Sequence, residues 1–210
     1  MFSEAALVSF TAALFSIMNP VGTLGVFCSM TEGRPANETR HIAWTCAGAI
    51  AITLLIVTWC GALLLQFFGI TVHLIRAAGG VILLIIGIQM LFNKSEHKHS
   101  STELKDAESR ESIAVVPMAI PIVAGPGTMA TVLVAAQQHS SVLSKMEISI
   151  VIVCLAAITG LLFSFAKSIA KRLGESGMAV VTRVMGLILA AIAMGMLTEG
   201  LKSILPGLAG

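Results

Sequence analysis

Residues 116–128 read V-P-M-A-I-P-I-V-A-G-P-G-T, which places three prolines and two glycines inside one of the most apolar segments of the chain. Pro126 has no N–H, so in a helix the carbonyl of Ile122 loses its partner, and Pro121 has the same effect earlier in the segment. A membrane-spanning helix tolerates such residues only where the freed backbone groups find other partners. We therefore predict a helix that is broken at Gly125-Pro126.

The first apolar segment carries a counterpart in its middle, which reads Met18-Asn19-Pro20-Val21-Gly22-Thr23. Pro20 and Pro126 lie 106 residues apart. Downstream, Arg-Ala-Ala-Gly at residues 76–79 is echoed by Arg-Val-Met-Gly at residues 183–186, at an offset of 107. Two matches at nearly one offset predict an internal duplication, and corresponding broken segments in two halves are typical of transporter binding sites.

The composition indicates an integral membrane protein. The 210 residues are 56% hydrophobic and only 11% charged, with a mean hydropathy of +0.93, whereas soluble domains carry about 25% charged residues. The net charge of +2 does not predict a nucleic-acid partner, because the basic residues lie in loops between apolar runs. The partners we expect are a small-molecule substrate and the lipid bilayer.

Neither a metal nor a cofactor is expected. The four cysteines lie singly in apolar runs, without a C-x-x-C spacing: Cys28, Cys46, Cys60 and Cys154. Isolated cysteines of this kind behave as small buried apolar residues. His97 and His99 lie in a polar segment of mixed charge, which we interpret as a solvated tether.

Hydropathy predicts six spans, at residues 5–30, 42–65, 74–92, 113–136, 147–166 and 178–197. The residues between the spans are predicted as loops, and the first span as a helix that is retained. The polar segment 93–112 is predicted as a linker that separates a first repeat (1–92) from a second (113–210). Three spans per half is an odd number, so duplicated halves enter the membrane from opposite sides. The expected fold is all-α, with two inverted three-helix repeats whose helices 1 and 4 are broken at mid-membrane.

The lysines and arginines predict the orientation in the membrane. With the N-terminus outside, ten of them fall in inside loops and only three outside, and positive residues favour the cytoplasmic side. We expect a multi-pass protein of the cytoplasmic (inner) membrane with both termini outside and residues 93–112 in the cytoplasm.

The two breaks have the composition of helix starts. Asn19 stands where an N-cap would, with Pro20 at the first helical position, and Gly125-Pro126 repeats the arrangement. The predicted half-helices expose backbone N–H groups and carry the positive end of a helix dipole, which favours an anionic group. The N–H groups concerned are those of Gly22, Thr23, Gly127 and Thr128.

The carbonyls of Ser16 and Ile122, which Pro20 and Pro126 deprive of partners, favour a cation. If inversion brings both breaks to one central volume, donors for a carboxylate and acceptors for an ammonium lie together there. This combination predicts a site for a zwitterion. No Asp, Glu, Lys or Arg lies in the middle of a span, which favours a net-neutral substrate and argues against a carboxylate proton relay. The glycine and alanine around the breaks indicate a small substrate.

Other functions stay open at this point. One alternative is the efflux of another small solute, a cation or a drug, although cation efflux commonly uses intramembrane acids. Another is a membrane accessory protein without transport activity. An enzyme is not expected, because the spans contain no Ser/His/Asp set, no H-E-x-x-H and no paired carboxylates. The glycine-rich third span leaves a homo-oligomer open.

Several of these motifs together resemble those of the MarC family of bacterial and archaeal membrane proteins. They are Asn19-Pro20-Val21-Gly22, Ile75-Arg76-Ala77-Ala78-Gly79-Gly80, Val116-Pro117-Met118-Ala119-Ile120-Pro121, Ala124-Gly125-Pro126-Gly127, and Arg183-Val184-Met185-Gly186. The resemblance covers nearly the whole chain except the linker. It implies transport of small neutral amino acids such as glycine, alanine and serine.

Overall fold

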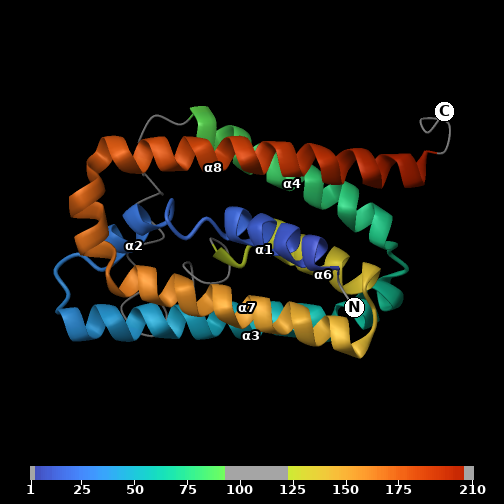
Figure 1. Ribbon diagram of the computed structural model, residues 1–210, viewed down its shortest axis with the longest axis horizontal. Coiled ribbons are helices and arrows are strands. Elements are labelled where there is room, and N and C mark those ends of the chain that lie inside the picture. Colours follow the sequence, from blue (N-terminus) through green and yellow to red (C-terminus); the bar gives the residue numbers. More distant parts are fainter. Residues whose placement is uncertain (1–2, 93–122, 206–210) are drawn as a thin grey trace.

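The computed structural model describes residues 3–92 and 123–205, in which the regular elements are helices. In chain order they are α1 (Glu4–Met18), α2 (Leu24–Met30), α3 (Ala36–Phe68), α4 (Val72–Phe92), α6 (Pro126–Gln138), α7 (Val142–Ser164) and α8 (Ala166–Ile204) (Figure 1). Within the described part, four helices are long and apolar enough to cross a membrane, namely α3, α4, α7 and the Ser176–Ile204 part of α8. The prediction of an all-α membrane protein is confirmed, whereas the linker 93–112 lies outside the described residues.

Two long antiparallel helix pairs enclose the shorter helices. α4 packs along α8, and α3 packs along α7 (Figure 1). α1, α2 and α6 lie between the two pairs, with α6 in contact with both α3 and α4. The first predicted span is therefore divided into α1 and α2, as the sequence predicted for a break at Asn19-Pro20.

Glycines allow α4 and α8 to approach until their backbones touch. A Cβ on Gly87 would lie 2.9 Å from the backbone nitrogen of Ala190 and 3.0 Å from the carbonyl oxygen of Gly186. A Cβ on Gly80 would lie 2.7 Å from the nitrogen of Leu197. Small residues drive helix association in a membrane because they permit such close packing. The glycines of the third span thus serve contacts within one chain.

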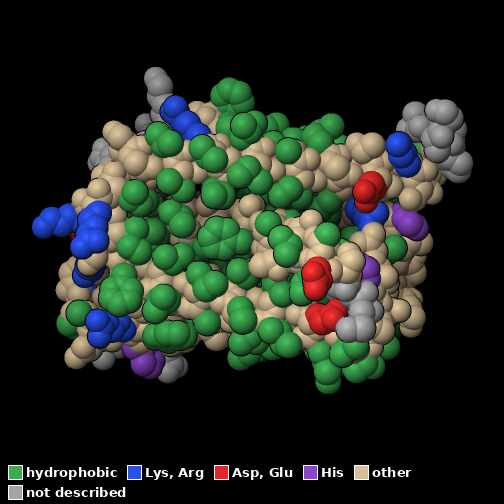
Figure 2. Space-filling model, viewed as in Figure 1, with side chains coloured by type: hydrophobic (Ala, Val, Ile, Leu, Met, Phe, Trp, Pro, Cys, Tyr) green, Lys and Arg blue, Asp and Glu red, His purple; other side chains and the backbone are tan. Residues whose placement is uncertain are grey.

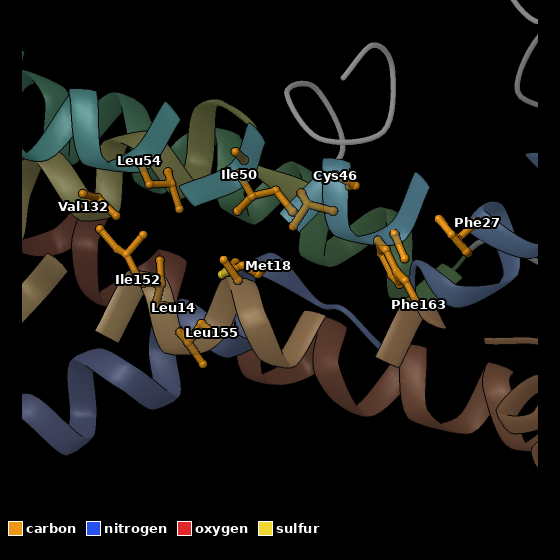
Figure 3. Packing of buried hydrophobic residues seen from close by; sticks show 14 of the residues in the cluster. Leu14, Met18, Phe27, Cys46, Ile50, Leu54, Val132, Ile152, Leu155 and Phe163 are labelled. Atoms are coloured by element: carbon orange, nitrogen blue, oxygen red, sulfur yellow. The ribbon is translucent and has the colours of Figure 1, made fainter. Parts of the chain in front are cut away.

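The core lies between the α3–α7 pair and the shorter helices (Figure 3). It contains Leu14, Met18, Phe27, Cys46, Ile50, Leu54, Val132, Ile152, Leu155 and Phe163, all nearly inaccessible. The rings of Phe27 in α2 and Phe163 in α7 stack with centroids 4.6 Å apart. Large apolar side chains such as Phe67 and Leu63 are exposed instead, and apolar side chains cover the broad face in Figure 2. An apolar exterior suits a surface that faces lipid.

The helices extend beyond the predicted spans, and the predicted loop at 167–177 is wrong. Those residues are helical apart from a kink at Gly174, whose positive φ of 63° favours glycine. α3 begins at Ala36, inside the loop predicted at 31–41, and α7 begins at Val142, inside the loop predicted at 137–145. Hydropathy detects only the apolar part of a helix, whereas the first turns of α3 and α7 include charged or hydroxyl residues and lie outside it.

The two ends of the molecule differ in charge. α1 begins and α8 ends at one end, while α3 and α8 begin at the other (Figure 1). Lys and Arg side chains gather at the end where α3 and α8 begin, on the left in Figure 2. Arg40, near the start of α3, and Lys167, in the first turn of α8, belong to this basic end.

Candidate functional site

The first break begins at Asn19, which ends α1 and does not start α2. Asn19 has left-handed backbone angles (φ 44°, ψ 53°), and its N–H donates to the carbonyl of Phe15. Asparagine adopts this conformation more readily than most residues, and a residue that precedes proline is disfavoured in the right-handed helical region. The predicted N-cap role of Asn19 is therefore wrong, because α2 begins only at Leu24.

The N–H groups of Gly22 and Thr23, which we expected to be exposed, are bonded within the turn. Gly22 donates to Oδ1 of Asn19 at 3.1 Å, and Thr23 donates to the Asn19 carbonyl at 3.1 Å. The Thr23 hydroxyl donates to the carbonyls of Asn19 and Pro20 at 3.2 Å each. This part of the prediction is wrong because the Asn19 side chain folds over the turn and occupies the amide of Gly22.

The amide nitrogen of Asn19, Nδ2, faces a weak acceptor. Nδ2 of Asn19 lies 3.8 Å from Sδ of Met90 in α4, and a thioether is a weak acceptor. Asn19 thus orders the break through Oδ1 and presents Nδ2 toward α4. Ser16, whose carbonyl lies four residues before Pro20, is buried nearby in the last turn of α1.

The second break has the predicted form of a helix start. Gly125 is the N-cap of α6, with extended backbone angles, and Pro126 occupies the first helical position. The first backbone hydrogen bond runs from Met129 to the Gly125 carbonyl at 3.0 Å. The N–H groups of Gly127 and Thr128 therefore precede the helical ladder, and no intrahelical carbonyl faces them.

The Thr128 side chain turns back to the preceding segment, where its hydroxyl donates to the carbonyl of Val123 at 2.9 Å. Gly127 and Thr128 are both buried. The predicted contributions of Pro121 and of the Ile122 carbonyl lie outside the described residues.

The second break packs against α4, and the first contacts α4 through the side chain of Asn19. A Cβ on Gly127 would lie 2.3 Å from Cδ2 of Leu83, so this leucine covers the start of α6. Leu83 shares a buried cluster with Ile17, two residues before Asn19, and Asn19 contacts Met90 farther along α4. Seven residues of helix span about 10 Å. The structure thus brings the two breaks to α4 about two turns apart, with Leu83 between Ile17 and Gly127.

Two methionines at the breaks escaped the sequence analysis. The Thr131 hydroxyl in α6 lies 3.8 Å from Sδ of Met196 in α8, as Asn19 lies 3.8 Å from Sδ of Met90 in α4. Met90 and Met196 are 106 residues apart, the offset that separates Pro20 from Pro126. Extending the repeat comparison beyond the conspicuous motifs would have found this pair. Leu83 has a counterpart at the same offset as well, because Leu189 lies 106 residues later and shares its buried cluster.

The buried polar side chains of the described residues are all serines and threonines: Ser16, Thr23, Thr31, Thr39, Thr58, Thr128, Thr131, Ser144 and Thr159. Residues 3–92 and 123–205 contain no group of three His, Cys, Asp or Glu that could hold a metal ion. The chemistry at the breaks is thus that of amides, hydroxyls and backbone groups, which can bind a polar solute.

Comparison with known proteins gives a consistent result. Residues 5–205 match the family described as "MarC family integral membrane protein". The UPF0056 membrane protein YvbG of Bacillus subtilis is 37% identical, over 92% of this chain and 93% of its own length. The UPF0056 membrane protein YhcE of Escherichia coli is 35% identical, over 99% and 97%.

A third relative, a UPF0056 membrane protein of Methanocaldococcus jannaschii, is 36% identical, over 92% of this chain and 95% of its own length. No solved structure matches the chain. The match to the family covers both helix breaks and all the helices described above except the first residue of α1. The chain therefore belongs to the MarC family of integral membrane proteins.

Proposed function

We propose that this protein is a secondary transporter of small neutral amino acids such as glycine, alanine and serine. The observation that carries the proposal is the pair of helix breaks at Asn19-Pro20 and Gly125-Pro126, which recur at an offset of 106 and each contact a side chain of α4. Broken helices in corresponding places of two halves are typical of substrate sites in transporters. Helices that served only for packing would gain no stability from such a break in each half of the chain.

The pattern of helix contacts supports an inverted repeat. If α2 corresponds to α6, α3 to α7 and α4 to α8, the contact of α4 with α6 has a counterpart in the contact of α8 with α2. The contact of α3 with α6 likewise has a counterpart in that of α7 with α2. A two-fold axis in the membrane plane would produce matched contacts of this kind. The same axis would exchange α4 with α8 and α3 with α7.

The available groups suit a small zwitterion. Nδ2 of Asn19 and the N–H groups that begin α6 are donors for a carboxylate, and the start of α6 adds the positive end of a helix dipole. The Ser16 carbonyl, without a helical partner because of Pro20, is an acceptor for an ammonium. Because the buried polar side chains of the described residues carry no charge, a net-neutral substrate is favoured over a charged one.

Alternating access would proceed by a movement of the α4–α8 pair relative to the shorter helices. Leu83 covers Gly127, and Met90 faces Asn19, so both breaks are closed by side chains of one helix. A shift of α4 would uncover both at once. The glycines that join α4 to α8 favour movement of these two helices as one body.

The basic end of the molecule is assigned to the cytoplasm of a cell with an inner membrane. It carries the Lys and Arg residues at the start of α3 and α8, and positive residues favour the cytoplasmic side. Both termini then lie outside, because α1 begins and α8 ends at the opposite end. Efflux of a cation or drug is less well supported, since the described spans bury no carboxylate.

Calorimetry on the purified full chain tests the proposed substrate class. Glycine, alanine and serine should bind saturably, whereas lysine and aspartate should not, because the described breaks offer no buried counter-charge. Equal heats for the charged and neutral amino acids, or none for any of them, would contradict the proposal.

A further inference from the structure

A cavity of about 350 Å³ lies at the basic end of the molecule, away from the helix breaks. It forms where α3 begins and where α7 passes into α8, and it is lined by Ala36, Thr39, Arg40, Ser164, Phe165, Lys167 and Ser168. None of these residues belongs to the breaks, so the transport proposal assigns it no role. The lining combines two cations, three hydroxyls and one aromatic ring without a carboxylate.

The two cations are held at the cavity by contacts that leave donors unused. The guanidinium carbon of Arg40 lies 6.0 Å from the centroid of the Phe165 ring, and stacking on a ring face does not consume its N–H groups. Nζ of Lys167 donates to the carbonyl of Arg34 at 3.1 Å, and an ammonium has three donors. The nearby Glu38 forms an ion pair with Arg34.

One helix start adds to the positive potential. α3 begins at the cavity, with Ala36 in its first turn, and its N-cap residue, Pro35, supplies no side-chain hydrogen bond to that turn. Helix starts attract anions through such N–H groups, so the start of α3 reinforces the two side-chain cations. The start of α8 directly follows the end of α7 at Phe165, so the opposite dipole ends of these two helices offset each other there.

Aromatic side chains place the cavity at the boundary of the membrane. Trp44 follows Arg40 by one turn and is 50% exposed, and Phe165 is 49% exposed. The Trp44 ring packs beside Gly160, where a Cβ would lie 3.3 Å from it. Tryptophan and tyrosine mark the headgroup level of membrane proteins, and Trp44 is the residue of this kind beside the cavity. The apolar spans lie on one side of this headgroup level, and the basic end of the molecule lies on its opposite side.

We propose that this cavity binds the phosphate group of an anionic phospholipid. Basic pockets between membrane helices on the cytoplasmic side suit such headgroups, and the exposed rings of Trp44 and Phe165 would lie beside the acyl chains. The shared chemistry is a phosphate anion, and the position at the boundary of the apolar surface favours a lipid over free phosphate. The proposal does not depend on what the protein transports.

Native mass spectrometry of the purified full chain tests the proposal. Dioleoyl-phosphatidylglycerol should bind more tightly than dioleoyl-phosphatidylcholine, and Arg40→Gln or Lys167→Gln should each lower its affinity about fivefold. Arg40→Lys keeps the charge and should retain most of the preference. The matched control is Lys145→Gln, because Nζ of Lys145 lies 5.8 Å from the Trp59 ring at the opposite end, and it should leave the preference unchanged.

The outcomes decide between the alternatives. Equal binding of the two lipids by the parent protein would overturn the proposal. Unchanged phosphatidylglycerol binding in the double variant, which carries both Arg40→Gln and Lys167→Gln, would overturn it as well. Displacement of the lipid by millimolar inorganic phosphate would overturn the lipid assignment in favour of free phosphate. If Arg40→Gln cannot be purified, Lys167→Gln decides, because Lys167 is exposed and its loss leaves no buried group unpaired.

Discussion

Oδ1 of Asn19 accepts a hydrogen bond from the backbone N–H of Gly22 at 3.1 Å, across the intervening Pro20 and Val21. A Cβ on Gly22 would lie 2.1 Å from Nδ2 of the same side chain, so glycine is needed where Asn19 folds over the turn. One asparagine thus orders the first break through its oxygen and leaves its nitrogen beside a weak acceptor, Met90.

Asn19→Ala should weaken the binding of alanine and glycine. In the proposed complex the substitution removes a hydrogen bond from Nδ2 to a carboxylate, which is worth roughly 1.5–3 kcal/mol. That corresponds to a loss of affinity of about ten- to a hundred-and-fifty-fold. Calorimetry on the purified variant measures the change.

Asn19→Gly separates binding from backbone strain. Glycine adopts the left-handed angles of position 19 without the steric cost that alanine meets there. We expect it to unfold at a higher temperature than Asn19→Ala and to bind as weakly. Lys202→Ala, an exposed change in the last turn of α8, is the remote control and should bind like the parent. Parental affinity in both Asn19 variants would remove Asn19 from the site.

Gly127→Val should lower both stability and binding. The new side chain would collide with Leu83, whose Cδ2 lies 2.3 Å from the position of a Cβ, and overpacking costs about 1–3 kcal/mol. The valine would also crowd the N–H groups at the start of α6. Thermal unfolding and alanine binding are measured on the same preparation.

The double variant Gly127→Val/Leu83→Ala distinguishes the two effects. Removing the leucine side chain makes room for the valine, so the unfolding temperature should recover in part. Binding should stay weak, because the valine still stands over the start of α6. Recovery of both properties would mean that Gly127 matters only for packing.

The sequence predicts the helix breaks because proline and glycine act locally. Pro126 removes an N–H and fixes one backbone angle, and Gly125 precedes it as a cap, so α6 begins where the residues require. At the first break the same reasoning predicts a helix start at Asn19, whereas Asn19 ends α1. Its side chain accepts a hydrogen bond from Gly22, three residues later, and this contact is not visible in the local sequence.

Tertiary contacts could not be predicted in the same way. Leu83 is one of many leucines in an apolar span, and nothing local shows that it covers Gly127. Hydropathy predicts loops at the first turns of α3 and α7 because these turns contain charged or hydroxyl residues, and hydropathy does not detect helical hydrogen bonding. The Ser141 side chain, which accepts from the N–H of Ser144 at 3.2 Å, was the local signal for the start of α7.

Gly186→Ala should destabilise the protein, whereas Gly195→Ala on the same helix should not. A Cβ on Gly186 would lie 2.9 Å from the carbonyl oxygen of Gly87, a backbone atom that can move only if α4 and α8 separate. A Cβ on Gly195 would meet nothing within 4 Å, and alanine favours a helix over glycine by roughly 1 kcal/mol. Thermal unfolding in detergent measures both, and equal unfolding temperatures would contradict the assigned α4–α8 contact.

Labelling of intact cells should show residues 140 and 203 outside and residue 101 inside. Ser140→Cys and Ser203→Cys, made after replacement of the four native cysteines, lie at the end of the molecule where α1 begins. An impermeant thiol reagent should modify both and leave Ser101→Cys unmodified until the cells are opened. The reverse pattern would invert the assigned orientation.

Counterflow in proteoliposomes tests the central claim most directly. Vesicles that contain the purified protein are loaded with unlabelled alanine and diluted into labelled alanine, alongside vesicles with Gly127→Val and vesicles without protein. We predict transient accumulation of label in the parent vesicles, little in the Gly127→Val vesicles, and suppression by external glycine or serine but not by lysine. Accumulation no greater than in vesicles without protein would contradict the claim that this chain transports small neutral amino acids.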